Sequence, residues 1–151
     1  LLGMGQNQSD EVTMMERSGG CACGAIRFKI SGAPVAIGIC HCTNCQRSSG
    51  GGPAYVALVP RPALALTQGT PKAYSRPGDS GQNIDRMFCR DCGTPLWNVP
   101  DHGPLLTVRL GAFDDAVDLA PQVHIYVASA PAWHPLNDDL PKFPGMPPAA
   151  H

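Results

Sequence analysis

The chain has 151 residues and a formal net charge of −1, and no apolar run approaches the roughly 20 residues of a membrane-spanning helix. This length suffices for one domain with a real hydrophobic core. Acidic and basic residues are interspersed without a basic block, which disfavours nucleic-acid binding as the main role. Sixteen prolines and seventeen glycines favour short strands joined by turns over long helices.

Both ends of the chain are predicted to lie outside the fold. Residues 1–18 show no hydrophobic period and contain small and polar side chains, so we expect a disordered leader there. Met14 or Met15 is a candidate natural start, which would make the preceding residues an upstream extension or an expression remnant. Residues 144–151 are rich in proline and are expected to form a flexible tail. A single domain over residues 19–143 remains.

Short strands are predicted along this domain. In residues 25–30, apolar Ile26 and Phe28 alternate with basic Arg27 and Lys29, which is the period of a half-buried strand. Turn residues separate the other candidates. The further predicted strands are 35–39, 54–59, 64–67, 72–75, 84–88, 94–99, 105–110 and 124–127. The expected fold class is therefore mainly β, with mostly antiparallel strands.

One short helix interrupts this pattern. Thr43 and Asn44 are residue types that begin helices, and the predicted helix continues through Cys45 to Arg47. Three glycines and a proline at 50–53 end it. Cys45 would lie in the first turn, where the helix dipole favours a thiolate.

The seven cysteines form three tight clusters, which are the strongest functional signal in the sequence. The clusters are Cys21 with Cys23, Cys40 with Cys42 and Cys45, and Cys89 with Cys92. Spacings of one or two residues let thiolates share one zinc, which takes sulfur ligands at about 2.3 Å in tetrahedral geometry. The two outer pairs could close a structural site. The middle cluster supplies three ligands and leaves a position for water or a substrate sulfur.

Other uses of these cysteines explain the pattern less well. Disulfides would leave one thiol over, no signal-peptide core opens the chain, and cysteines one residue apart rarely satisfy disulfide geometry. Cysteines that serve only as core residues would be scattered. The division into four and three ligands stays open, because exchanging one cysteine or building one shared cluster would also use all seven. Reduced, metal-bound thiols favour a cytoplasmic location.

Three segments around the cysteines resemble the glutathione-dependent formaldehyde-activating enzyme family, which also includes centromere protein V. They are GGCACGAIRF at 19–28, CHCTNCQR at 40–47 and FCRDCGTPL at 88–96. Similar segments follow: VRLGAFDD at 108–115, HIYV at 124–127, AW at 132–133 and DLP at 139–141. The resemblance covers about residues 18–143, nearly all of the predicted domain.

This resemblance implies a fold, ligands and an activity. The implied fold is an Mss4-like β-tent of short antiparallel strands around a structural zinc. The implied structural ligands are Cys21, Cys23, Cys89 and Cys92, and the implied ligands of a second, catalytic zinc are Cys40, Cys42 and Cys45. The implied activity is that of a carbon–sulfur lyase that forms or cleaves S-hydroxymethylglutathione or a related conjugate. Glutathione is the implied cosubstrate, and the partners would be a small thiol and an aldehyde.

The middle cluster suits this chemistry. Zinc held by three thiolates carries a net negative charge, so it is better suited to binding a soft thiolate than to generating hydroxide. We therefore expect the substrate thiol to bind there and its sulfur to attack an aldehyde carbonyl. Two alternatives remain: a non-catalytic zinc-binding module, and a thiol or zinc redox sensor whose middle site loses metal on oxidation.

Polar residues near the clusters are weaker candidates. Arg47 follows the middle cluster, and we predict that it binds a carboxylate of the cosubstrate, or that it balances the anionic zinc centre. Gln46 is a lesser candidate for the same role, and Arg86 and Arg109 are others. His41 lies between two predicted ligands and is expected to point away from the metal.

The remaining aromatic and imidazole side chains carry little functional signal. His124 begins an apolar strand and is expected to be a structural histidine. His102 lies in a predicted turn and is expected to be solvated. Tyr126, Trp133 and His134 could line a cleft, although such side chains more often belong to the core.

Overall fold

The computed structural model describes residues 15–78 and 80–148; the predicted leader up to residue 14 lies outside them. The strands are β1 (Glu16–Gly20), β2 (Arg27–Ser31), β3 (Ala36–Cys40), β4 (Ala54–Pro60), β5 (Leu64–Gln68), β6 (Lys72–Pro77), β7 (Asn83–Phe88), β8 (Pro95–Pro100), β9 (Leu105–Arg109) and β10 (Val123–Ile125). The described helices are α2 (Thr43–Ser49) and the 3₁₀ turns η1 (Arg61–Ala63), η2 (Leu110–Ala112) and η3 (Val127–Ser129). None of them has the length and apolar character needed to cross a bilayer.

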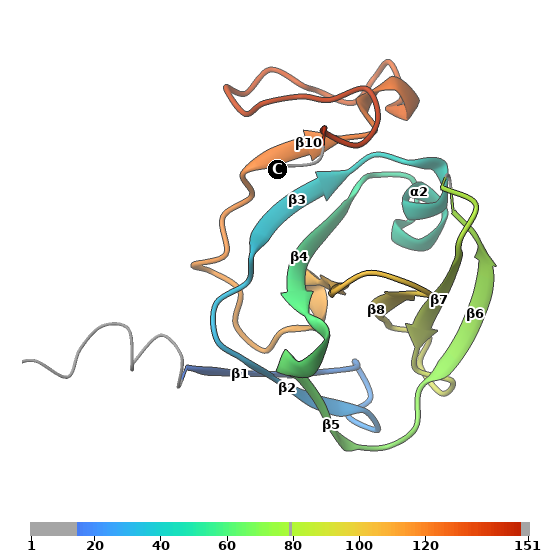
Figure 1. The fold of residues 1–151 in the computed structure, drawn as a ribbon, viewed down its shortest axis with the longest axis vertical. Coiled ribbons are helices and arrows are strands. Elements are labelled where there is room, and N and C mark those ends of the chain that lie inside the picture. The colour runs from blue at the N-terminus through green and yellow to red at the C-terminus, as the bar shows by residue number, and fades with distance from the viewer. Residues whose placement is uncertain (1–14, 79, 149–151) are drawn as a thin grey trace, which may run out of the picture.

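Two sheets build the domain, and the mainly β prediction is confirmed. The larger sheet has the order β10-β3-β4-β9-β8-β7-β6, and the smaller one has the order β1-β2-β5. Every pairing is antiparallel except that of β10 with β3. The larger sheet curves, so that β6 and β7 stand across from β3 and β4, and α2 lies near one end of the space between them (Figure 1).

The hydrophobic core joins the two sheets. Phe28 of β2 is fully buried, and its ring makes edge contacts with Trp97 of β8 and Phe113 at centroid distances of 5.4 and 5.9 Å. Ala57 and Val59 of β4 belong to the same core. Because side chains alternate along a strand, their neighbours on β4 face the other side of the large sheet. The cavity described below lies on that other face.

Strand β1 includes residues that were predicted to belong to the disordered leader. Glu16–Gly20 pairs along its whole length with β2, so the boundary at residue 18 is wrong. Its sequence, ERSGG, has no alternation of apolar residues. Backbone pairing with β2 therefore holds this strand in place. Gly19 is required there: a Cβ would lie 2.3 Å from the Ala112 carbonyl oxygen. Arg17 adds an ion pair with Asp118.

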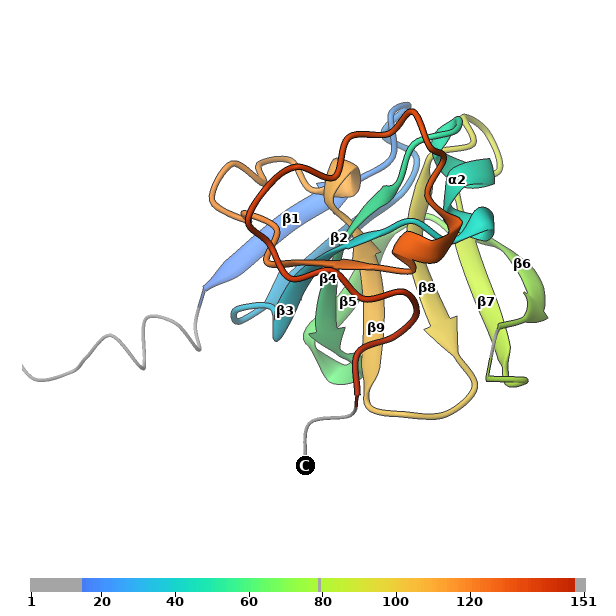
Figure 2. The same ribbon diagram turned by 90° about the horizontal axis from the view of Figure 1, so that it is seen from above.

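The predicted tail is also partly wrong. The segment after β10 folds back beside that strand, as both views show (Figures 1 and 2). The amide of Tyr126 donates to the Gly145 carbonyl at 3.1 Å, and the amide of Val127 donates to the Phe143 carbonyl at 3.0 Å. Proline-rich sequence lacks amide donors, but here its carbonyls act as acceptors for other segments. The described residues 144–148 therefore belong to the fold.

Candidate metal centres and active site

The four outer cysteines meet although their two pairs are far apart in the sequence. Cys21, Cys23, Cys89 and Cys92 place their sulfur atoms within 4.8 Å of one another. The distance from Cys23 Sγ is 3.6 Å to Cys21 Sγ and 3.7 Å to Cys89 Sγ. Tetrahedral zinc with bonds of about 2.3 Å requires sulfurs about 3.8 Å apart, so the cluster fits a closed zinc site.

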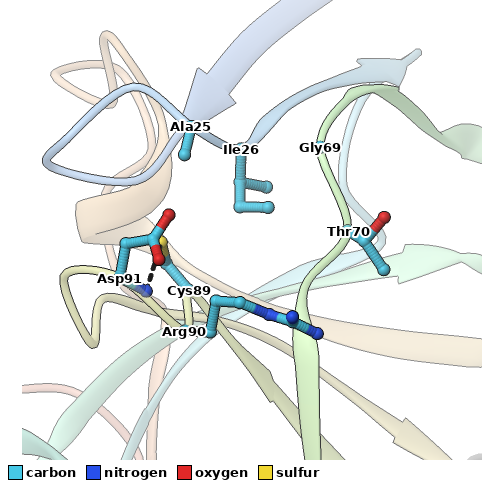
Figure 3. Close-up of a pocket in the computed structure, with 7 residues that line it drawn as sticks. All are labelled: Ala25, Ile26, Gly69, Thr70, Cys89, Arg90 and Asp91. Atoms are coloured by element: carbon cyan, nitrogen blue, oxygen red, sulfur yellow. Dashed lines mark hydrogen bonds between the residues drawn. The ribbon is translucent and has the colours of Figure 1, made fainter.

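Backbone turns hold these four sulfurs in place. The amide of Ile26 donates to Cys21 Sγ at 3.2 Å, and the amide of Asp91 donates to Cys89 Sγ at 3.4 Å. Figure 3 shows the second of these bonds and places the 89–91 turn beside Ala25 and Ile26. Gly93, at φ +78°, closes the turn in the left-handed region. Such N–H···S bonds stabilise thiolates and orient them toward a metal.

The middle cluster lies where β3 runs into α2. Cys40 is the last residue of β3, Cys42 is the N-cap of α2, and Cys45 lies in its first turn. Their sulfurs lie within 4.8 Å of one another, and Cys42 Sγ accepts the amide of Cys45 at 3.3 Å. The predicted helix is therefore present and begins at Thr43, with Cys42 as its cap. Gly50 ends it in the left-handed conformation.

Hydrogen bonds within the cluster concentrate negative charge on one sulfur. The thiols of Cys40 and Cys45 donate to Cys42, which lowers the pKa of Cys42 far below its usual range, while the same interactions raise the pKa of Cys40. Cys40 and Cys45 are only 7% and 9% exposed, so burial adds to the cost of further thiolates. The cluster is a soft, anionic donor set, which fits zinc with one position left for a ligand.

A cavity of about 390 Å³ opens beside the middle cluster. It occupies the face of the large sheet opposite the core, and all three cysteines line it together with Tyr126 and Arg86. No carboxylate, imidazole or ammonium group lines it among the described residues. The three cysteine sulfurs are thus the nucleophilic groups available to a molecule bound there, beside the Arg86 guanidinium and several uncharged polar side chains.

A histidine network lies behind the cluster, and no local sequence pattern indicated it. His41 is fully buried, and its Nε2 lies 2.8 Å from Nδ1 of His124, with the two rings stacked. His124 Nε2 lies 2.8 Å from the carboxylate of Asp138, which also accepts from Lys142 at 3.0 Å. His134 makes an edge contact with His41. His41 does not line the cavity, as expected from its place between two ligands.

When both imidazoles are neutral, the network has one consistent proton arrangement. Asp138 accepts from Nε2–H of His124, so Nδ1 of His124 must accept from Nε2–H of His41. Nδ1 of His41 is then the deprotonated nitrogen, and it is buried without a hydrogen-bond partner among the described residues. Burial, together with the neighbouring histidines, lowers the pKa of His41, which keeps it neutral. The network fixes the chain between Cys40 and Cys42 from behind.

Replacing Asp138 with leucine should disturb this arrangement without touching a cysteine. Leucine matches the size of the side chain but accepts no hydrogen bond, so the proton on His124 loses its acceptor. We expect His41 to be an Nε2–H tautomer in the wild-type protein and a mixture of tautomers in Asp138→Leu. Long-range ¹H–¹⁵N spectra of the imidazoles measure this directly. Asp139→Leu, at an exposed neighbouring position, is the matched control. An unchanged His41 tautomer in Asp138→Leu would contradict the proton arrangement described for the histidine network.

The other predicted polar residues fall in different places. Arg47 is exposed on α2 and does not line the cavity. Gln46 donates hydrogen bonds from its side-chain amide to the carbonyls of His41 and Ser129, so it connects α2 to the loop before it and to η3. Arg109 donates to the Ser48 hydroxyl and lines a separate surface pocket. Only Arg86 of the predicted arginines lines the cavity.

The remaining candidates divide between surface and cavity. His102 is exposed, as predicted, and Trp133 is 72% exposed, so it lines no closed cleft. Tyr126 lines the cavity and takes up a left-handed backbone with φ of 58°. The sequence placed Tyr126 among the possible cleft residues but gave no signal for its conformation.

Comparisons with known proteins identify relatives of this chain. The profile of a family described as "Glutathione-dependent formaldehyde-activating enzyme" matches residues 16–129. A protein of Halomonas elongata named "Putative glutathione-dependent formaldehyde-activating enzyme" is 28% identical over 127 residues, covering 76% of this chain and 77% of that protein. The crystal structure of a Rhodobacter sphaeroides protein has a similar fold, with a TM-score of 0.54, 20% identity, and coverage of 68% of this chain and 94% of that chain. The chain belongs to the glutathione-dependent formaldehyde-activating enzyme family.

Proposed function

We propose that this protein is a zinc-dependent carbon–sulfur lyase that forms or cleaves the adduct of a thiol and an aldehyde. S-hydroxymethylglutathione, or a related glutathione conjugate, is the substrate that the family description suggests. The observation that carries the proposal is the middle cluster: three sulfurs within 4.8 Å of one another, at the edge of a cavity. A purely structural site would have four ligands and no access.

The reaction needs little from the protein beyond binding and orientation. The thiol sulfur bonds to the carbonyl carbon, and the thiol proton goes to the carbonyl oxygen, so the adduct contains every atom of both reactants. The reverse reaction breaks the same C–S bond. When bound by Cys40, Cys42 and Cys45, zinc supplies a Lewis-acidic centre that favours thiolates.

The chain's own residues contribute position and exclusion of water. The buried walls of the cavity hold both reactants close together, and such proximity lowers the entropic part of the barrier. No carboxylate or imidazole lines the cavity among the described residues, so neither group is proposed as the proton donor to the carbonyl oxygen. His41 and Gln46 keep the loop between Cys40 and Cys42 fixed through the network and the side-chain amide hydrogen bonds described above.

Exchange spectroscopy with ¹³C-formaldehyde and glutathione tests the proposal. The two compounds combine spontaneously, so the relevant quantity is the exchange rate above the protein-free rate. We expect zinc-loaded protein, at concentrations far below those of the reactants, to accelerate both formation and breakdown of the adduct. Heat-denatured protein with the same zinc content is the control. No acceleration by a protein with both sites filled would contradict the proposal.

A sensing role is the second candidate, and one observation favours it. Cys42 combines a strongly lowered pKa with partial exposure, and two further thiols lie beside it. Thiolates of this kind are the ones that oxidise first and then form a disulfide with a neighbour. Zinc release at low peroxide concentrations, fully reversed by a thiol reductant and without adduct turnover, would favour this role over catalysis.

A further inference from the structure

We propose that the cavity beside the middle cluster binds an adduct with an apolar body that ends in a carboxylate, with the carboxylate held by Arg86. The inference rests on the proposed function, because it names the class of thiol–aldehyde adduct that the site would take. The sulfur of the adduct would lie at Cys40, Cys42 and Cys45, and its apolar part would fill the cavity.

The walls of the cavity are the first argument. They come from one face of the large sheet, where alternate side chains of neighbouring strands point the same way. The aliphatic ones include Val56 and Leu58 of β4 and Val123 and Ile125 of β10, and uncharged polar side chains such as Asn98 and Thr107 line the same cavity. Apolar walls gain free energy by covering apolar ligand surface, and they leave polar ligand groups without partners. An aliphatic or aromatic body fits this space.

Arg86 is the second argument. It lies on β7 opposite Asn98 of β8 and lines the cavity. Its Nη1 is buried and has no hydrogen-bond partner among the described residues. No acidic side chain lines the cavity in the described part of the chain. A guanidinium that is partly removed from water and has no counter-ion favours binding of an oxyanion. A carboxylate can accept two parallel hydrogen bonds from it in a bidentate pair.

Gly38 is the third argument, because it leaves space at the cavity wall. It lies on β3, on the same face as Ala36 and Cys40, and lines the cavity. A Cβ built on it would meet its first neighbour, Val123 Cγ1, at an ordinary 3.7 Å. The glycine is therefore not needed for packing or for its backbone angles. It keeps open room that a larger side chain would fill.

A glutathione moiety matches these features only at one of its two carboxylates. It carries two carboxylates, an amino group and two peptide bonds, whereas Arg86 is the one cationic side chain that lines the cavity among the described residues. Arg47 and Arg109, the other candidate partners for carboxylates, do not line this space. The size of the cavity, about 390 Å³, also lies near the low end of the usual range for ligand sites.

Binding of unreactive probes tests the inference independently of turnover. The probes are 3-phenylpropionate, its neutral amide 3-phenylpropanamide, and S-methylglutathione, titrated calorimetrically into zinc-loaded protein. We expect the carboxylate to bind about tenfold more tightly than the amide, since hydrogen bonds to charged groups contribute that much. In Arg86→Met this difference should disappear. Lys72→Met, which removes an exposed cation from β6, should leave it unchanged.

A second variant keeps the inference testable if Arg86→Met does not fold. Gly38→Val fills the cavity without altering a cysteine or a charge, and we expect it to weaken binding of both phenyl probes about tenfold or more. Equal binding of the carboxylate and the amide to the wild-type protein would overturn the inference. Tighter binding of S-methylglutathione than of 3-phenylpropionate would also overturn it. Adduct turnover without probe binding refutes only this inference, whereas probe binding without turnover refutes only the proposed lyase activity.

Discussion

Replacing Cys89 with serine is expected to unfold the protein under conditions in which the wild type is stable. Cys89 is 1% exposed, and it links the turn after β7 to the turn between β1 and β2. Structural zinc sites of this kind contribute about 10–16 kcal/mol at neutral pH. A domain of this size has a net stability of about 5–15 kcal/mol, so losing the site removes most or all of it. Far-UV circular dichroism and thermal melting measure the effect.

Cys42→Ser is the matched control for this variant, because it makes the same chemical change in the other cluster. Adding a strong chelator to the wild-type protein should reproduce the unfolding of Cys89→Ser, and restoring zinc should reverse it. A cooperative transition in Cys89→Ser within a few degrees of the wild type would show that the outer cluster does not hold the fold.

Cys42→Ser is expected to keep the fold and lose turnover. Cys42 caps α2, and its sulfur is one of the three that lie within 4.8 Å of one another, so its loss would leave the middle site with two ligands. Serine can still cap the helix, since its hydroxyl accepts the Cys45 amide. Changes to residues that merely support metal ligands cost about 10–100-fold, and loss of a ligand should cost about 100-fold or more. The measurement is adduct exchange above the spontaneous rate.

The fold control for this variant is its melting temperature, which should lie close to that of the wild type. Ser48→Ala changes a hydroxyl on the same helix outside the cluster, although it also removes the partner of Arg109. A Cys42→Ser protein that retains full turnover would remove the middle cluster from the mechanism.

Local sequence signals predicted much of this structure. The alternation of Ile26 and Phe28 with basic residues marked β2, and the glycines around residue 50 marked the end of α2. The cysteine spacings identified both groups of sulfurs that the structure brings together. These signals are local because ligands one or two residues apart are brought close by a single turn.

Features that depend on distant pairing could not be predicted in this way. His41 and His124 are 83 positions apart, and they meet because β10 pairs in parallel with β3, placing His124 opposite Ile39. Asp138 reaches them through the returning C-terminal segment. Strand β1 was missed for the same reason, because it is formed by pairing with β2 and its own sequence has no alternation of apolar residues. The cavity arises from the curvature of the large sheet, which no short sequence window encodes.

The proposed activity requires two separate zinc sites in one chain, and native mass spectrometry tests this most directly. Zinc is counted in the wild-type protein and in Cys42→Ser, after saturation with zinc and removal of the excess. We predict two zinc ions per wild-type chain and one per folded Cys42→Ser chain. A single zinc in the saturated wild-type protein, or two in Cys42→Ser, would contradict an open three-cysteine site and the chemistry proposed for it.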